Sequence, residues 1–177
     1  LKVSQTPIKE AFTRLEKEGF VFTIPHRGTM VNELSKKDVL EMFQVRGALE
    51  TLALTLAIPH VKQSDTERLR RINANFKKAV NEKNMKRATE EDFNFHEAIY
   101  KLSMNNRLHN LVNYSNVHLL SIAEMSNDFF GNSERYYLNH TQIIEAIENQ
   151  VTKRAVDMLQ EHLEYAVKQV LESKMVK

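Results

Sequence analysis

Asp92 and three histidines have the residue types and the spacing of a metal site. Asp92 and His96 are four positions apart, so on a helix both side chains project from one face. His140 and His162 each lie on the apolar stripe of a later helical stretch. We therefore expect four ionisable groups from three helices to point at the same core.

These four groups would cost several kcal/mol if an apolar interior left them unpaired. Two arrangements avoid that cost: the groups hydrogen-bond to one another, or they share a cation. Three imidazoles and one carboxylate suit a divalent first-row transition metal with one or two coordination positions open. Zinc is the expected ion, and nickel, manganese or iron would suit the same donors. Three further histidines lack such partners and are expected at the surface or as capping residues: His60, His109 and His118.

The elements that position these residues are predicted to be long helices. The chain of 177 residues has four glycines and three prolines, too few for the many turns of a β-sandwich or barrel. From Ser35 onward, capping residues and breakers indicate six helical stretches: 35–59, from 64, 84–103, from after 106 to about 127, from 133, and from 152 to the end. Ser35 with Asp38 is expected to start the first stretch, and Ser64 with Glu67 has the spacing of a capping box. Short connections favour an antiparallel bundle.

Composition narrows the class of protein. The absence of cysteine excludes disulfides, thiolate metal sites and cysteine nucleophiles. No run approaches the ~20 apolar residues that cross a bilayer, and no leader is visible, so a cytoplasmic protein without a membrane partner is expected. The net charge of +2 resides in residues 1–31, which carry five Lys/Arg against three Glu and are where a polyanion would bind.

The first residues predict an amphipathic helix. Pro7 falls in its first turn behind a cap at Ser4 or Thr6, and Gly19 ends it. Its apolar positions recur at helical spacing and are expected to be buried: Ile8, Ala11, Phe12 and Leu15. The opposite face offers groups that could reach base edges and phosphates: Gln5, Lys9, Thr13 and Lys17. A helix with a merely solvated polar face is the alternative.

A hairpin is expected next, because β-rich residues 20–24 and 29–31 flank a basic turn. Residues 1–12, 15–21 and 25–31 resemble the GntR family of bacterial winged-helix regulators, whose pattern is roughly L-x-V-S-R-T-P-V-R-E-A-L, then L-x-x-E-G-L-V, then R-G-x-x-V. The resemblance implies operator DNA as a partner. The implied contacts are the recognition-helix positions Ser4, Gln5, Thr6 and Lys9 and the wing-tip positions His26, Arg27 and Gly28.

Two positions of the implied recognition helix depart from the family pattern. Gln5 and Lys9 stand where the family usually has arginine, so Gln5 could pair with adenine and Lys9 would supply a point charge. A winged helix-turn-helix also has two helices ahead of its recognition helix. The resemblance therefore implies that roughly 35 residues are missing before Leu1, and a chain without them is expected to bind DNA poorly.

The bundle resembles the ligand-sensing FCD domain of the FadR subfamily of these regulators. The resemblance covers about residues 38–165 and rests on 45–50, 92–99, 103–108, 140–147 and 155–163. In metal-binding members an Asp, a His four positions later and two further His bind the ion. The implied ligands are Asp92, His96, His140 and His162.

Arg46 interrupts an apolar run and has two interpretations. Its spacing from Glu50 fits an i,i+4 ion pair. The resemblance instead implies an inward arginine that holds the carboxylate of a small organic acid, the effector. Tyr100 and Tyr114 could add hydroxyl donors to such a site.

These observations predict a mostly α protein in two parts. Residues 1–34 would be the C-terminal part of a winged helix-turn-helix, and 35–177 an antiparallel bundle of about six helices that binds the effector. The resemblance implies a homodimeric transcriptional regulator and no enzyme. The alternative is a metal-dependent hydrolase on a helical bundle. It is disfavoured because Asp92, the only carboxylate clearly on the inner stripe, would already be a ligand, which leaves no general base.

Overall fold

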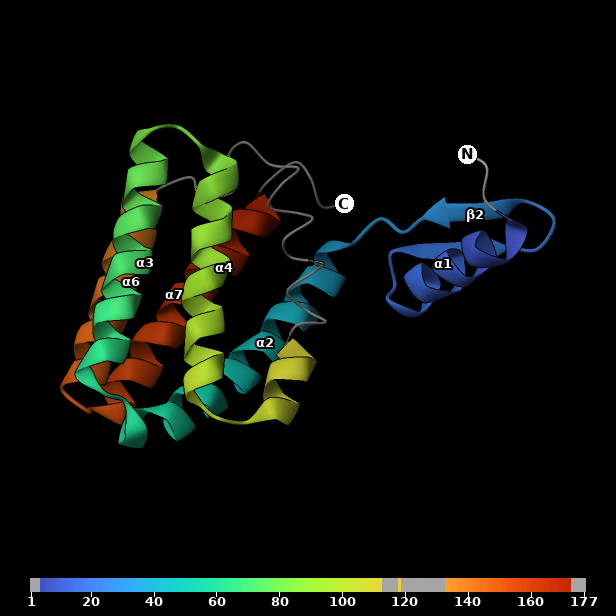
Figure 1. Cartoon of the computed structure of the whole chain (residues 1–177). Helices are drawn as coiled ribbons and strands as arrows, with labels where there is room; N and C mark the ends of the chain where they lie inside the picture. Colours follow the sequence, from blue (N-terminus) through green and yellow to red (C-terminus); the bar gives the residue numbers. More distant parts are fainter. Residues whose placement is uncertain (1–3, 113–117, 119–132, 173–177) are drawn as a thin grey trace.

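The mostly α fold is confirmed in a computed structural model, which describes residues 4–112, 118 and 133–172 (Figure 1). The elements are α1 (Gln5–Lys17), β1 (Val21–Ile24), β2 (Gly28–Val31), α2 (Lys36–Ala57), the 3-10 helix η1 (Ile58–His60), α3 (Gln63–Asn81), α4 (Met85–Leu102), α6 (Ser133–Glu148) and α7 (Thr152–Glu172). Residues 106–112 are also helical. Among the described residues, no helix is long and apolar enough to cross a membrane.

Five long helices pack in a closed ring. Going round the ring, α2 packs on α4, α4 on α3, α3 on α6, α6 on α7, and α7 on α2 again (Figure 1). Short turns join α3 to α4 and α6 to α7, so each of these pairs is antiparallel. The core inside the ring is filled by fully buried aliphatic and aromatic side chains, which include Leu54, Phe76, Phe95, Ile143 and Leu159. Side chains on the inner faces of these helices therefore share one core.

The helix starts follow from capping chemistry, with one correction. At the start of α2, the backbone N–H of Ser35 donates to the Asp38 carboxylate at 2.8 Å, and the Asp38 N–H donates to the Ser35 hydroxyl at 3.2 Å. The predicted cap of α3 at Ser64 is wrong. That helix begins at Gln63 with Lys62 as its N-cap, and the Asp65 carboxylate accepts the Lys62 N–H at 2.9 Å. Because the Asp65 carboxylate lies three residues after Lys62 and accepts that N–H, α3 begins at Gln63, before the predicted cap.

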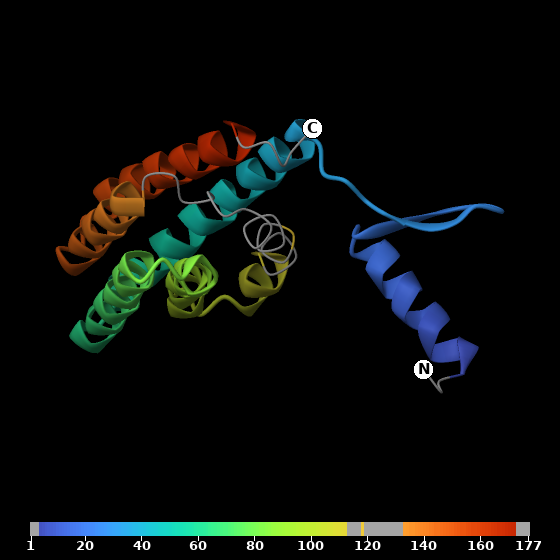
Figure 2. The same ribbon diagram turned by 90° about the horizontal axis from the view of Figure 1, so that it is seen from above.

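The hairpin is confirmed between β1 and β2, which pair antiparallel from Val21–Val31 to Ile24–Gly28. His26 and Gly28 have φ of 63° and 94°, the left-handed backbone that a tight turn requires. The Glu16 carboxylate accepts the Thr23 N–H at 2.9 Å and holds α1 against the hairpin. Residues 32–35 lead from this unit into the bundle (Figure 2).

The predicted burial of the apolar stripe on α1 is wrong for the described residues. Ile8 and Phe12 are 42% and 43% exposed, and with Ala11 and Leu15 they line a shallow open hollow. The hairpin is the element that packs on α1, and it leaves this stripe uncovered. Helical periodicity identifies which face is apolar, but it does not identify what covers that face.

His118 is not at the surface, but its contact with Glu18, the C-cap residue of α1, fits the other half of its prediction, a capping residue. Its side chain is buried, and its ring stacks on Phe20 with centroids 4.2 Å apart. Its Nε2–H donates to the backbone carbonyl of Glu18 at 2.6 Å. His118 therefore connects a residue far along the chain with the turn that ends α1.

Candidate metal centre

The structure brings together four polar groups from three helices that are separate in the sequence. Asp92 and His96 come from α4, His140 from α6 and His162 from α7, and all four are buried. We call these four residues the Asp–His cluster. One ligand atom from each lies within 4.8 Å of the others, close enough for one ion to touch all four.

The atoms of the cluster face one another, but only one pair of them is within a hydrogen bond, His96 Nε2 and His162 Nε2. His96 Nε2 and His162 Nε2 are 3.1 Å apart, and His140 Nε2 and Asp92 Oδ1 are 3.4 Å apart. Three buried atoms of the cluster have no hydrogen-bond partner among the described residues: Asp92 Oδ1, His140 Nε2 and His162 Nδ1. Each such atom carries a desolvation cost of about 1–3 kcal/mol that no hydrogen bond among the described residues offsets.

Two residues outside the cluster orient its histidines. The Glu50 carboxylate on α2 lies 2.7 Å from His96 Nδ1, and the Asn73 amide oxygen on α3 lies 3.2 Å from His140 Nδ1. An ionised carboxylate and an amide oxygen only accept, so both Nδ1 atoms donate and both Nε2 atoms keep a lone pair toward the cluster. These are the lone pairs that a metal needs.

The Asn73 amide is itself held in place. Its Nδ2 donates to the Tyr137 carbonyl and to the Thr141 hydroxyl, each at 3.1 Å. With both of its donor hydrogens engaged on α6, the oxygen of the same amide turns to His140. Ring stacking fixes the other side of that imidazole, because the Phe95 ring lies against it with centroids 3.9 Å apart.

Arg46 forms the ion pair with Glu50 that its spacing predicts, and it also points inward. Its side chain points into the bundle, is 4% exposed, and its Nε donates to the Glu50 carboxylate as an i,i+4 ion pair. The Tyr100 hydroxyl donates to the same carboxylate oxygen at 2.5 Å. Arg46 Nη2 is buried and has no hydrogen-bond partner among the described residues. Tyr114 lies outside the described residues.

The electrostatics of this region combine burial with pairing. Burial alone would raise the pKa of Glu50, but the charge of Arg46 and the hydrogen bonds from His96 and Tyr100 outweigh it and hold that pKa well below its ordinary value. Burial lowers the pKa of His140 despite the opposing charge of Asp92. Burial and the neighbouring imidazoles lower the pKa of His162 well below its ordinary value. In the metal-free protein, these two imidazoles are therefore neutral at pH 7.

These shifts predict that the metal-free protein loses stability as the pH falls. A histidine with a depressed pKa contributes stability that is complete above the unfolded value of about 6.5 and is lost as pH falls toward the folded value. Each of His140 and His162 adds a slope of up to about 1.4 kcal/mol per pH unit in that window. Urea unfolding of chelator-treated protein at pH 7.5, 6.5 and 5.5 measures this, and His162→Gln should flatten the slope. A free energy of unfolding that is constant from pH 7.5 to 5.5 would contradict the prediction.

Sequence reasoning identified the Asp–His cluster but assigned no role to its partners. Asn73 interrupts the apolar stripe of Leu69 and Phe76 on α3, and such an amide on an inner face was the available signal. Glu50 was visible only as a neighbour of Arg46. Its contact with His96 spans 46 residues, and no local pattern predicts that.

The predicted DNA contacts lie on exposed parts of the first unit. Ser4, Gln5, Thr6 and Lys9 belong to the cap and first turns of α1. His26, Arg27 and Gly28 form the turn between β1 and β2 and its exit. Each of these seven residues is exposed, as contact with a nucleic acid requires.

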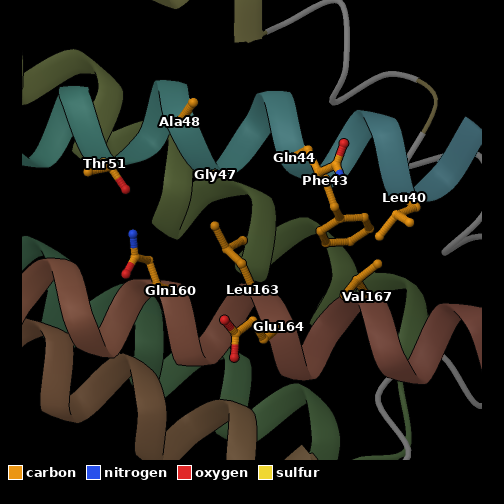
Figure 3. Close-up of a pocket in the computed structure, with 10 residues that line it drawn as sticks. All are labelled: Leu40, Phe43, Gln44, Gly47, Ala48, Thr51, Gln160, Leu163, Glu164 and Val167. Atoms are coloured by element: carbon orange, nitrogen blue, oxygen red, sulfur yellow. The ribbon is translucent and has the colours of Figure 1, made fainter.

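A separate groove lies between α2 and α7. It has a volume of about 550 Å³. In Figure 3, Phe43, Leu163 and Val167 lie in the space between the two helices, and Thr51 and Gln160 face each other toward one end. Neither Arg46 nor a residue of the Asp–His cluster lines it. The groove and the cluster are therefore separate features of the bundle.

Comparisons of the sequence with known proteins match a domain family and regulators of transcription. The model of the FCD domain matches residues 41–165. An uncharacterised HTH-type transcriptional regulator of Bacillus subtilis (strain 168), YdhC, is 29% identical over 171 residues, which cover 92% of this chain and 73% of that protein. The HTH-type transcriptional repressor RspR of Escherichia coli (strain K12) is 23% identical over 171 residues, covering 95% and 75% of the two chains.

Solved structures share the fold. The E. coli protein McbR/YncC superposes with a TM-score of 0.83 at 19% identity, covering 96% of this chain and 86% of that one. A putative GntR transcriptional regulator from Rhodococcus sp. RHA1 gives a TM-score of 0.73 at 22% identity, covering 97% and 82%. The sequence relatives named above are regulators of transcription, not enzymes.

Proposed function

We propose that this chain, which belongs to the FCD domain family, senses a small organic acid with a metal centre inside its bundle. It is a transcriptional regulator of the GntR family. What we propose is what it senses and the metal centre with which it does so. A divalent transition metal, with zinc first and nickel, manganese or iron as the other suitable ions, would be held by Asp92, His96, His140 and His162.

The observation that carries this proposal is the set of unpaired atoms in the Asp–His cluster. Asp92 Oδ1, His140 Nε2 and His162 Nδ1 are buried without hydrogen-bond partners among the described residues, and two Nε2 atoms face each other at 3.1 Å. The donor set of three imidazoles and one carboxylate fits a first-row divalent ion. When bound, such an ion supplies a Lewis-acid position that a carboxylate oxygen can occupy.

The acid would be held at two points. Arg46 Nη2 is a buried charged donor without a hydrogen-bond partner among the described residues, and a carboxylate is its natural acceptor. Arg46 Nε is committed to Glu50, so the guanidinium offers its free Nη2 and not its whole planar edge. A small acid with one carboxylate toward the cluster and another polar group toward Arg46 would satisfy both points.

The output would be a change in DNA affinity. Residues 1–34 would form the DNA-reading unit and 35–177 the sensing unit of a homodimer on a two-fold operator. Ser4, Gln5, Thr6 and Lys9 would approach base edges and phosphates, while His26, Arg27 and Gly28 would lie along the backbone or in the minor groove. The acid would shift DNA affinity to the extent that it binds the two states of the dimer differently.

Binding of small carboxylates with and without metal tests the sensing function. We expect some mono- or dicarboxylic acids to raise the melting temperature of zinc-loaded protein by several degrees and to leave chelator-treated protein unchanged. Lys9→Ala on the exposed face of α1 is the control and should retain the full shift. Equal shifts with and without zinc, or no shift from any small acid, would contradict a metal-dependent carboxylate site.

A further inference from the structure

Glu50 is a charged residue in the middle of the bundle, and its two carboxylate oxygens have different partners. The side chain comes from α2 and is fully buried. Its Oε1 accepts from Arg46 Nε and from the Tyr100 hydroxyl. Its Oε2 lies 2.7 Å from His96 Nδ1. One carboxylate therefore joins α2 to two positions on α4.

The division of oxygens determines which nitrogen of His96 carries the proton. Because Oε1 already receives two donors, Oε2 is the atom left to meet the imidazole, and a carboxylate has no hydrogen to give. His96 Nδ1 must donate, so His96 Nε2 presents a lone pair. That lone pair points at His162 Nε2, 3.1 Å away inside the Asp–His cluster.

We propose that Glu50 is a positioning residue of the metal centre, which holds His96 in the Nδ1–H form with Nε2 bare toward the ion. This inference rests on the proposed metal site. Arg46 and Tyr100 act through Glu50, because their donation to Oε1 fixes which oxygen of Glu50 faces His96. Glu50 itself lies outside the four residues that would hold the ion.

The network is poorly explained by stability alone. A buried ion pair is commonly neutral or unfavourable against apolar residues of similar size, so stability gives no reason to place Arg46 and Glu50 in the core. The two outer partners also differ in charge: His96 faces a carboxylate, whereas His140 faces the neutral amide of Asn73. A carboxylate behind a histidine fixes the ring and raises its basicity as a ligand.

Glu50→Gln is the sharpest test because it changes one atom and reverses one hydrogen bond. Arg46 and Tyr100 donate to the position of Oε1, so the glutamine oxygen takes that place and its NH₂ turns to His96. That NH₂ donates to Nδ1 and forces the proton of the imidazole to Nε2, where the ion would bind. We expect the zinc dissociation constant, measured against a competing chelator, to rise about 10- to 100-fold.

A spectroscopic readout separates positioning from simple support of the fold. Long-range proton–nitrogen NMR of the metal-free protein reports the tautomer of His96, and we expect Nδ1–H in the wild type and Nε2–H in Glu50→Gln. Glu148→Gln is the matched control. It makes the same change in a carboxylate that pairs with an arginine, Arg70, but Glu148 is not a residue of the Asp–His cluster, so the dissociation constant should stay within about threefold of wild type.

The outcomes distinguish this inference from the function on which it rests. A wild-type protein that binds no zinc contradicts the proposed metal site. If zinc binds but His96 is Nε2–H in the metal-free wild type, the role of Glu50 is overturned, even if the variant fails to fold. A folded Glu50→Gln protein with unchanged zinc affinity and an unchanged His96 tautomer overturns it as well.

Discussion

Replacing Arg46 by leucine is expected to lower the free energy of unfolding by about 3–5 kcal/mol. Arg46 is 4% exposed and its partner Glu50 is fully buried, so the substitution leaves a carboxylate in the core without its counter-ion. The remaining contacts of that carboxylate, from Tyr100 and His96, are single hydrogen bonds. Urea unfolding of the metal-free protein at pH 7.5 measures the loss.

The double variant Arg46→Leu/Glu50→Gln tests the cause. If the loss arises from an uncompensated charge, neutralising Glu50 should restore at least half of it, whereas a packing defect at residue 46 would remain. Arg14→Leu is a matched control, since Arg14 forms the same i,i+4 pair with Glu18 at 2.8 Å but on an exposed surface. It should leave the unfolding curve unchanged. A loss for Arg46→Leu no larger than that of the control would contradict the prediction.

The helices were predictable because their causes are local. Ser35 and Asp38 satisfy each other within one turn, and Asn84 accepts the Arg87 N–H at 3.1 Å, so three or four residues suffice to indicate each start. The predicted start of α3 was wrong for a reason that is equally local. Two overlapping frames, Lys62 with Asp65 and Ser64 with Glu67, compete there. The chain uses the first, in which Asp65 accepts the Lys62 N–H, while the Glu67 carboxylate accepts from the Gln63 side chain.

The Asp–His cluster was predictable because an inner stripe admits few polar residues. His140 and His162 interrupt the apolar faces of α6 and α7, so each one indicates the interior of the bundle. What the stripe does not encode is the neighbour. Glu50 meets His96 and Asn73 meets His140 only because α2 and α3 close the ring beside α4 and α6.

The stripe on α1 shows the opposite limit. Ile8 and Phe12 have the spacing of a buried face, yet both are exposed among the described residues. The amphipathic pattern records that a partner surface is needed, but the pattern is the same whichever surface that is. Burial was predictable in the bundle because the ring of helices that provides it lies within residues 36–172.

If the Asp–His cluster binds a metal, Asp92→Asn should remove the gain in melting temperature that zinc gives and should barely change the stability of the metal-free protein. At a free zinc concentration 100 times the dissociation constant, binding adds about 2.7 kcal/mol, which corresponds to roughly 5–10 °C in the melting temperature. Asp92→Asn removes a charged ligand, so we expect zinc affinity to fall at least about 100-fold and this shift to vanish. Without metal, the asparagine amide can donate to His140 Nε2, 3.4 Å from Asp92 Oδ1, so stability should change by at most about 1 kcal/mol.

The same comparison separates a metal ligand from a core residue. His162→Ala should also abolish the zinc shift, whereas His60→Ala, which changes an exposed histidine outside the cluster, should retain it. Thermal melts of the wild type and of each variant with excess zinc and with chelator, together with elemental analysis of the purified protein, provide this comparison. If Asp92 served only the fold, Asp92→Asn would lower the melting temperature equally with zinc and with chelator. Zinc uptake and melting temperatures that Asp92→Asn and His162→Ala leave unchanged would remove the metal centre, because no other group of histidines and carboxylates among the described residues converges closely enough to replace it.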